Sequence, residues 1–340
     1  MSEFKKILIA PDGFKESLKA IEVAKSMEIG VKKVWPKIET KLLPVADGGD
    51  GTMETIIGQS NGKIYNSMVT DPLGRKIVAE WGGIESKNIA VIEIAKSSGL
   101  SLLTEEERNP LITSTRGAGQ LIKEALDLGY KEIIIGVGGS ATNDGGIGML
   151  SELGVKFYNS EKKEIGDGGN ALIDLEYIDT SKLDNRIKNT SIIVACDVSN
   201  PLCGPKGASA IFGPQKGATP QMVSKLDKAL MNYAKIIKKD LGIDIINYPG
   251  SGASGGLGAA FMAFFGARLR LGADIVLDLL DIDTQLKDSN LVIVGEGQFD
   301  RSTIFNKAPI SVAHRAKSIG IPVLGIAGSL GAGFNEIHNH

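Results

Sequence analysis

The chain has 340 residues, a formal net charge of -2 and 42% hydrophobic residues, which is typical of a globular protein long enough for two domains. The balance of 38 basic and 40 acidic side chains excludes a strongly charged face for nucleic acid or an anionic membrane. No apolar run approaches the ~20 residues that a membrane span needs. With only Cys196 and Cys203, a disulfide framework is excluded, and we expect a protein of the reducing cytoplasm.

The N-terminal part of the chain alternates between strand and helix. The pattern predicts a strand at 6–10, a helix at 17–35, a strand at 40–45 and a helix at 52–59. The stretch 63–94 differs, because short β-rich pieces around turns predict antiparallel hairpins.

The alternation then returns. Helices are predicted at 115–128, 219–241, 257–270 and 310–319, and strands at 131–137, 192–196, 291–294 and 322–327. Strands separated by helices predict a parallel sheet with helices on both faces and ligands at its carboxyl edge. The β-rich interruption predicts a second α/β domain inserted into the first.

Five glycine-rich turns are predicted, at 46–52, 136–146, 250–258, 295–300 and 328–333. Such turns let successive backbone amides point at an anion, although α/β folds also need glycine wherever a strand turns sharply into a helix. Two of them formally match a dinucleotide fingerprint, but the first lacks a clear acidic partner and the second does not follow a strand. A nicotinamide-dependent dehydrogenase is therefore a weaker hypothesis than a phosphotransferase.

Aspartates stand in or beside these turns, where an anion site alone would not place them. Asp47, Asp144 and Asp197 suit Mg²⁺ ligation or a base that accepts a hydroxyl proton, and otherwise act as turn formers. The three histidines are badly placed for a Ser–His or Cys–His system, which disfavours a hydrolase.

Eight segments together resemble the type I glycerate kinase family. They are APDGFKESL at 10–18, PVADGGDGT at 44–52, DPLGR at 71–75, NPLITSTRG at 109–117, GGSATNDGG at 138–146, DVSNPLCG at 197–204, FGPQKGA at 212–218 and GEGQFD at 295–300. The family usually has Ser at the position of Gly13, Arg at that of Gln298 and Gly at that of Asn306. If that arginine touches phosphate, Gln298 weakens charge stabilisation in this chain.

The resemblance implies ATP- and Mg²⁺-dependent phosphorylation of D-glycerate, at the 2-hydroxyl or alternatively the 3-hydroxyl. It also implies two α/β domains: a flavodoxin-like parallel-sheet domain at 1–61 and 286–340, interrupted by a larger mixed α/β domain at 62–285. Family chains continue beyond His338 with a further strand and helix, so we expect the first sheet to lack its fifth strand. A non-catalytic anion-binding protein is the remaining alternative, and the oligomeric state stays open.

Site residues follow from this resemblance as hypotheses. For ATP we expect Gly138, Gly139, Ser140, Asn143, Gly252, Gly255, Gly256 and Glu296, with Mg²⁺ on Asp144 or Asp197. For D-glycerate, in a cleft between the domains, we expect Gly48, Gly49, Arg75, Ser114, Thr115 and Arg116. The catalytic residues would be Asp197 as base, Asp47 as the second candidate for that role, and Lys15.

Overall fold

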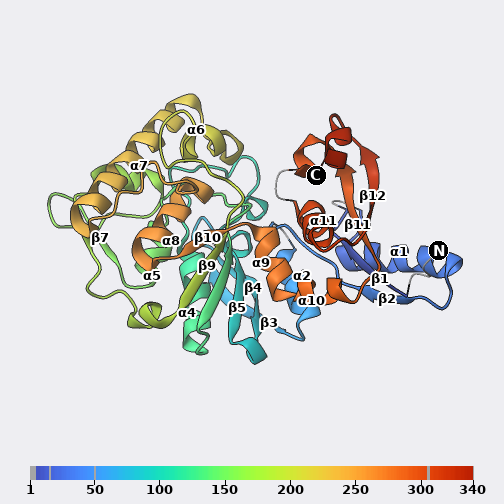
Figure 1. The fold of residues 1–340 in the computed structure, drawn as a ribbon. Helices are drawn as coiled ribbons and strands as arrows, with labels where there is room; N and C mark the ends of the chain where they lie inside the picture. Colours follow the sequence, from blue (N-terminus) through green and yellow to red (C-terminus); the bar gives the residue numbers. More distant parts are fainter. Residues whose placement is uncertain (1–4, 15–16, 50, 305–306, 340) are drawn as a thin grey trace. The chain divides into compact units, whose positions relative to one another are not determined.

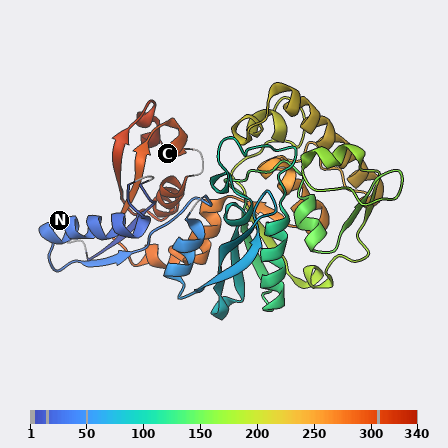
Figure 2. The ribbon, with the colours of Figure 1, turned by 180° about the vertical axis from the view of Figure 1, so that it is seen from behind.

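The structure is a computed structural model that describes residues 5–14, 17–49, 51–304 and 307–339. The chain forms two compact units, unit 1 from Met1–Gly62 with Leu271–His340 and unit 2 from Lys63–Arg270. In Figures 1 and 2, unit 1 combines the blue start of the chain with its orange-to-red end. Residues 271–285 belong to unit 1, whereas we expected them in the insert, because helix α9 (Gly272–Leu279) contacts α2 (Thr52–Gln59) and α11 (Ala308–Ser318).

Unit 1 contains a parallel sheet in the order β12-β11-β1-β2, formed by Val323–Leu330, Leu291–Phe299, Lys6–Pro11 and Glu39–Leu42. Read from β2, this is the 2-1-3-4 strand order of the flavodoxin-like arrangement. Strand β1 is central and almost wholly apolar, so Ile7, Leu8 and Ile9 are completely buried. Unit 1 also contains α1 (Ala20–Val34), α10 (Ile282–Lys287) and two helical turns, Arg301–Ile304 and Phe334–Asn339.

Unit 2 contains a six-stranded mixed sheet in the order β10-β9-β6-β5-β4-β3. Its strands are Arg268–Arg270, Ser191–Ala195, Glu132–Gly136, Ile89–Glu93, Lys76–Ile84 and Lys63–Thr70. The predicted hairpins are the antiparallel pairs β3–β4 and β4–β5, and the remaining pairs are parallel. A separate two-stranded sheet pairs β7 (Lys156–Tyr158) with β8 (Tyr177–Asp179).

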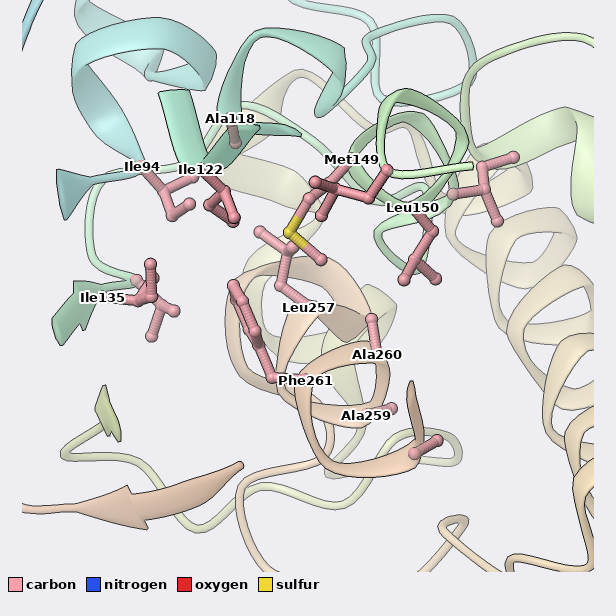
Figure 3. Packing of buried hydrophobic residues seen from close by; sticks show 14 of the residues in the cluster. Ile94, Ala118, Ile122, Ile135, Met149, Leu150, Leu257, Ala259, Ala260 and Phe261 are labelled. Atoms are coloured by element: carbon pink, nitrogen blue, oxygen red, sulfur yellow. The ribbon is translucent and has the colours of Figure 1, made fainter. Parts of the chain in front are cut away.

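Helices pack the parallel part of this sheet into one large apolar core. They are α3 (Ala95–Ser98), α4 (Arg116–Asp127), α5 (Ile147–Glu152), α6 (Ala208–Phe212), α7 (Pro220–Leu241) and α8 (Leu257–Phe265). Figure 3 shows Ile122 of α4, Met149 of α5 and Phe261 of α8 converging beside Ile135 of β6. Each fully buried side chain of this size contributes roughly 1.5–3 kcal/mol of hydrophobic stabilisation, so this core fixes the loops at the carboxyl edge.

Two of the predicted glycine turns are partly strand. Strand β11 continues to Phe299 and β12 to Leu330, with Gln298 opposite Ser329. The prediction of a loop is therefore wrong for 295–299 and for 328–330, whereas 331–333 is outside the strand. Parallel pairing satisfies the backbone of both segments, so their glycines do not interrupt the strands.

No helix within the described ranges is both long and apolar enough to cross a membrane.

Candidate functional site

A cavity of about 630 Å³ lies at the carboxyl ends of β1 and β2 in unit 1. Its wall includes Asp12, which directly follows β1, and Asp47, in the segment after β2. The start of helix α2 contributes Gly51, Glu54 and Thr55. Ligands of open parallel sheets bind at this edge, so the cavity is a candidate site for a small molecule.

Asp47 is half-buried, and its Oδ1 accepts a hydrogen bond of 3.0 Å from the N–H of Gly49. The N–H of Gly48 donates to Thr52 Oγ1 at 3.1 Å. The amides of Gly48 and Gly49, expected to meet the substrate carboxylate, thus bond within their own turn. Among the described residues, no hydrogen bond engages Oδ2 of Asp47, which leaves that oxygen suited to proton transfer.

Asp12 is not among the predicted site residues, although a carboxylate directly after a buried strand is a signal that points to it. Its Oδ1 accepts a hydrogen bond of 2.6 Å from the N–H of Gly13. Lys15, expected to be catalytic, lies outside the described residues, as does Asn306.

Glu296 projects from β11, the strand next to β1, and forms an ion pair with Lys307 at the start of helix α11. Thr303 also donates to it through Oγ1, at 3.4 Å. Burial raises the pKa of Glu296, with the charge of Asp47 acting in the same direction and Lys307 opposing it. Glu296 is thus paired with a lysine inside unit 1, and its contact with ATP stays a prediction.

Unit 2 presents exposed backbone amides at the end of β6. Gly138 and Gly139 are exposed, and Gly139 has a φ of +69°. No hydrogen bond within the described part of the chain engages the N–H of either glycine. Gly136 of β6 pairs with Ala195 of the neighbouring strand β9. Gly138 and Asp197 each follow two residues after this pair, and Asp197 is exposed. Free amides beside a carboxylate suit a phosphate group and its counter-cation.

Asp144 is completely buried, and both of its oxygens accept hydrogen bonds from the protein. Oδ2 accepts from the N–H and Oγ1 of Thr115, at 2.9 and 2.8 Å, and from the N–H of Gly148. Oδ1 accepts from the N–H of Gly146 at 3.1 Å. Burial raises the pKa of Asp144, and these four hydrogen bonds oppose that rise. The geometry therefore gives Asp144 a structural role where we expected a metal ligand.

Across the described ranges, no group of three or more His, Cys, Asp or Glu side chains is arranged to hold a metal ion. Asp197 is exposed at the carboxyl edge. Mg²⁺ is typically bound by one or two carboxylates together with phosphate oxygens of the substrate, and Asp197 could supply one such carboxylate.

The glycine turn at 250–258 packs against the 138–146 loop. Gly255 has a φ of +68°, and a Cβ there would lie 2.1 Å from the carbonyl oxygen of Thr142. Gly256 approaches the Cα of Gly145 in the same way, while Gly252 lies against Pro201. All three glycines are buried, so they serve close backbone packing, and their contact with ATP stays a prediction.

Ser140 and Asn143 also point inward. Ser140 is 4% exposed and Asn143 is fully buried, with its Nδ2 donating to Ser209 Oγ at 3.0 Å. Of the residues predicted for ATP in the 138–146 loop, the structure exposes Gly138 and Gly139 alone.

The predicted substrate-binding side chains of unit 2 are engaged within that unit. Arg116 forms ion pairs with Asp167 and Glu152, which raise its pKa. Arg75 pairs with Glu107 and Asp71. Ser114 and Thr115 are buried, and Ser114 Oγ accepts from the N–H of Arg116 at 3.2 Å. These contacts link distant segments of unit 2, and a role of these residues in binding substrate stays a prediction.

A two-unit α/β architecture, with free amides and a carboxylate at one parallel edge and a carboxylate-lined cavity at another, offers the groups that phosphoryl transfer needs. Comparison with known proteins makes this specific. The model of the glycerate kinase family matches residues 7–340.

Among individual relatives, "Glycerate 2-kinase" of Escherichia coli (strain K12) is 50% identical over 98% of this chain and 88% of its own length. "Glycerate kinase" of Bacillus subtilis (strain 168) is 49% identical over the same shares. A crystal structure from Salmonella typhimurium LT2, whose name carries the words glycerate kinase 2, superposes with a TM-score of 0.91 at 47% identity. It covers 97% of this chain and 90% of its own.

The chain therefore belongs to the glycerate kinase family, and it is a phosphotransferase with an alcohol group as acceptor.

Proposed function

We propose that this enzyme transfers the γ-phosphoryl group of ATP to the 2-hydroxyl of D-glycerate, giving 2-phosphoglycerate and ADP in the cytoplasm. The observation that carries the proposal is the 50% identity, over 98% of the chain, to a relative named glycerate 2-kinase. Location in the cytoplasm agrees with the two buried cysteines, which are both free thiols.

The nucleotide phosphates are proposed to bind the free amides of Gly138 and Gly139. Backbone N–H groups at a glycine turn neutralise phosphate oxygens without introducing a side chain between them. Asp197, two residues past the neighbouring strand, would hold Mg²⁺. When bound, Mg²⁺ supplies neutralisation of the charge on the transferring phosphoryl group.

Glycerate is proposed to bind in the unit 1 cavity, with Asp47 as the base. The hydroxyl oxygen attacks the γ-phosphorus while the bond from phosphorus to the ADP oxygen breaks, and the hydroxyl proton passes to the Asp47 carboxylate. Support comes from the position of Asp47 in the cavity wall and from its Oδ2, which is not engaged by the described residues. Asp197 is the other candidate for this base.

The test is release of ADP from ATP and Mg²⁺ in the presence of D-glycerate, followed by phosphorus NMR of the product. Signals of 2-phosphoglycerate would support the proposal, whereas 3-phosphoglycerate would retain the kinase and overturn the regiochemistry. NAD⁺ reduction by glycerate without ADP release would instead support a dehydrogenase.

A further inference from the structure

We propose that Lys216 is a positioning residue that holds the 138–146 loop from inside the protein, so that the amides of Gly138 and Gly139 face the nucleotide. The inference rests on the proposed nucleotide site. Lys216 ends a helical turn (Pro214–Lys216) in a segment that the site predictions do not use. Only 2% of this lysine is exposed, which is rare for a residue type that is almost never fully buried.

The contacts of Lys216 are directed at the loop. Its Nζ donates to Ser140 Oγ at 2.9 Å and to the carbonyl oxygen of Thr142 at 2.7 Å. These two acceptors flank Ala141, so one amine bridges the backbone across a single residue. Burial lowers the pKa of Lys216 to about 7, with the charge of Asp144 opposing this.

Other anchors hold the residues on either side of this bridge. The N–H of Ala141 donates to the carbonyl oxygen of Ser98 at 2.8 Å, and Thr113 Oγ1 donates to the carbonyl oxygen of Ala141 at 2.9 Å. Upstream, Ser254 Oγ donates to the carbonyl oxygen of Val137. Gly138 and Gly139 are the exposed span between these points, where the carbonyl oxygen of Gly139 accepts from the N–H of Leu100 at 2.9 Å. The position of Ser140, together with this bond, sets where their amides point.

Removing the Lys216 amine would leave the Ser140 hydroxyl and the Thr142 carbonyl without this donor in the interior. Buried acceptors that lose a donor favour a rearranged backbone, and the nearest exposed segment is 138–139. Phosphate affinity should therefore fall more than glycerate affinity, because the unit 1 cavity does not include this loop.

The experiment compares Lys216→Met with Lys225→Met, a matched substitution on the exposed face of helix α7. We expect Lys216→Met to raise the KM for ATP about tenfold and to change the KM for D-glycerate less than about twofold. Lys225→Met should match the wild type. A folded Lys216→Met enzyme with a wild-type KM for ATP would overturn the proposal, as would an equal loss for both substrates.

A second measurement keeps the positioning claim separate from the proposed function. Hydrogen exchange at the N–H groups of Leu100 and Ala141, which donate to the carbonyl oxygens of Gly139 and Ser98, should become faster in Lys216→Met than in Lys225→Met, whatever reaction the enzyme catalyses. If Lys216→Met does not fold, Ser140→Ala removes one of the two acceptors and should produce the same change in smaller measure. Unchanged exchange in the folded variant refutes the positioning role, whereas faster exchange in a protein that does not use ATP refutes only the nucleotide site.

Discussion

At the carboxyl edges of the two sheets, aspartates in similar glycine-containing loops have opposite environments. In unit 1, the turn after β2 places Asp47 in the wall of a cavity. In unit 2, the loop after β6 turns Asp144 inward, where four hydrogen bonds engage it and no part of it is exposed. Both segments contain glycine and aspartate after a strand. The packing of distant segments against the loop thus decides whether its carboxylate serves chemistry or structure.

Asp47→Asn is the sharpest test of the proposed base in the unit 1 cavity. Loss of a general base should lower kcat by about 10²- to 10⁴-fold, because the amide cannot accept the hydroxyl proton. Thermal unfolding should stay unchanged, and Asp288→Asn, at an exposed position of unit 1, should leave kcat at the wild-type value. A kcat within threefold of wild type for Asp47→Asn would assign the base to Asp197.

Gly255→Ala tests how tightly the loop after β6 is packed in unit 2. The new Cβ would lie 2.1 Å from the carbonyl oxygen of Thr142, at a φ of +68°. We expect the free energy of unfolding to fall by about 3 kcal/mol or more. Gly266→Ala has the same kind of φ but nothing within 4 Å, and should cost only about 1 kcal/mol in urea unfolding. Equal losses would show that backbone conformation, and not loop packing, sets the cost.

Asp144→Asn separates a structural role from a metal-binding role. The substitution places an N–H₂ group among donors, which should lower the free energy of unfolding by about 3 kcal/mol. The concentration of Mg²⁺ that gives half-maximal activity should not change, and Asp174→Asn on the surface should affect neither quantity. Normal stability with weakened Mg²⁺ dependence would return Asp144 to the metal site.

The buried lysine makes the stability of unit 2 depend on pH. Lys216 has a pKa of about 7 when folded and 10.5 as its ordinary value. Between these values the unfolded chain binds more protons, so the free energy of unfolding should rise with pH, by up to about 1.4 kcal/mol per pH unit. Below the folded pKa this contribution is flat. Urea unfolding across this range should show the rise in wild type and its loss in Lys216→Met; a parallel pair of curves would contradict it.

The smallest expected effect lies away from both edges. Gly30 is an exposed glycine in the middle of helix α1, and a Cβ there would meet nothing within 4 Å. Gly30→Ala should raise the free energy of unfolding by about 0.5–1 kcal/mol, since alanine loses less backbone freedom on folding. A loss of stability would mean that the exposed face of α1 is covered in solution.

Much of the fold could be predicted because its signals are local. The helix expected at 219–241 is Pro220–Leu241, where Thr219 caps the first turn by accepting from the N–H of Met222. The hairpin at 63–84 and the buried strand β1 follow equally from alternation and from continuous apolar runs. Helices α9 and α10 were missed, because short segments between longer elements carry weak periodicity.

The sequence by itself determined the family, the alternation of strands and helices, and which strand ends carry polar side chains. Only the tertiary structure decided which of those side chains face a cavity and which are buried. The burial of Asp144 depends on Thr115, and the course of its loop depends on Lys216 and Gly255, which are far away along the chain. Burial is a property of what packs against a residue, and no local pattern around Asp144 or Asp47 records those partners.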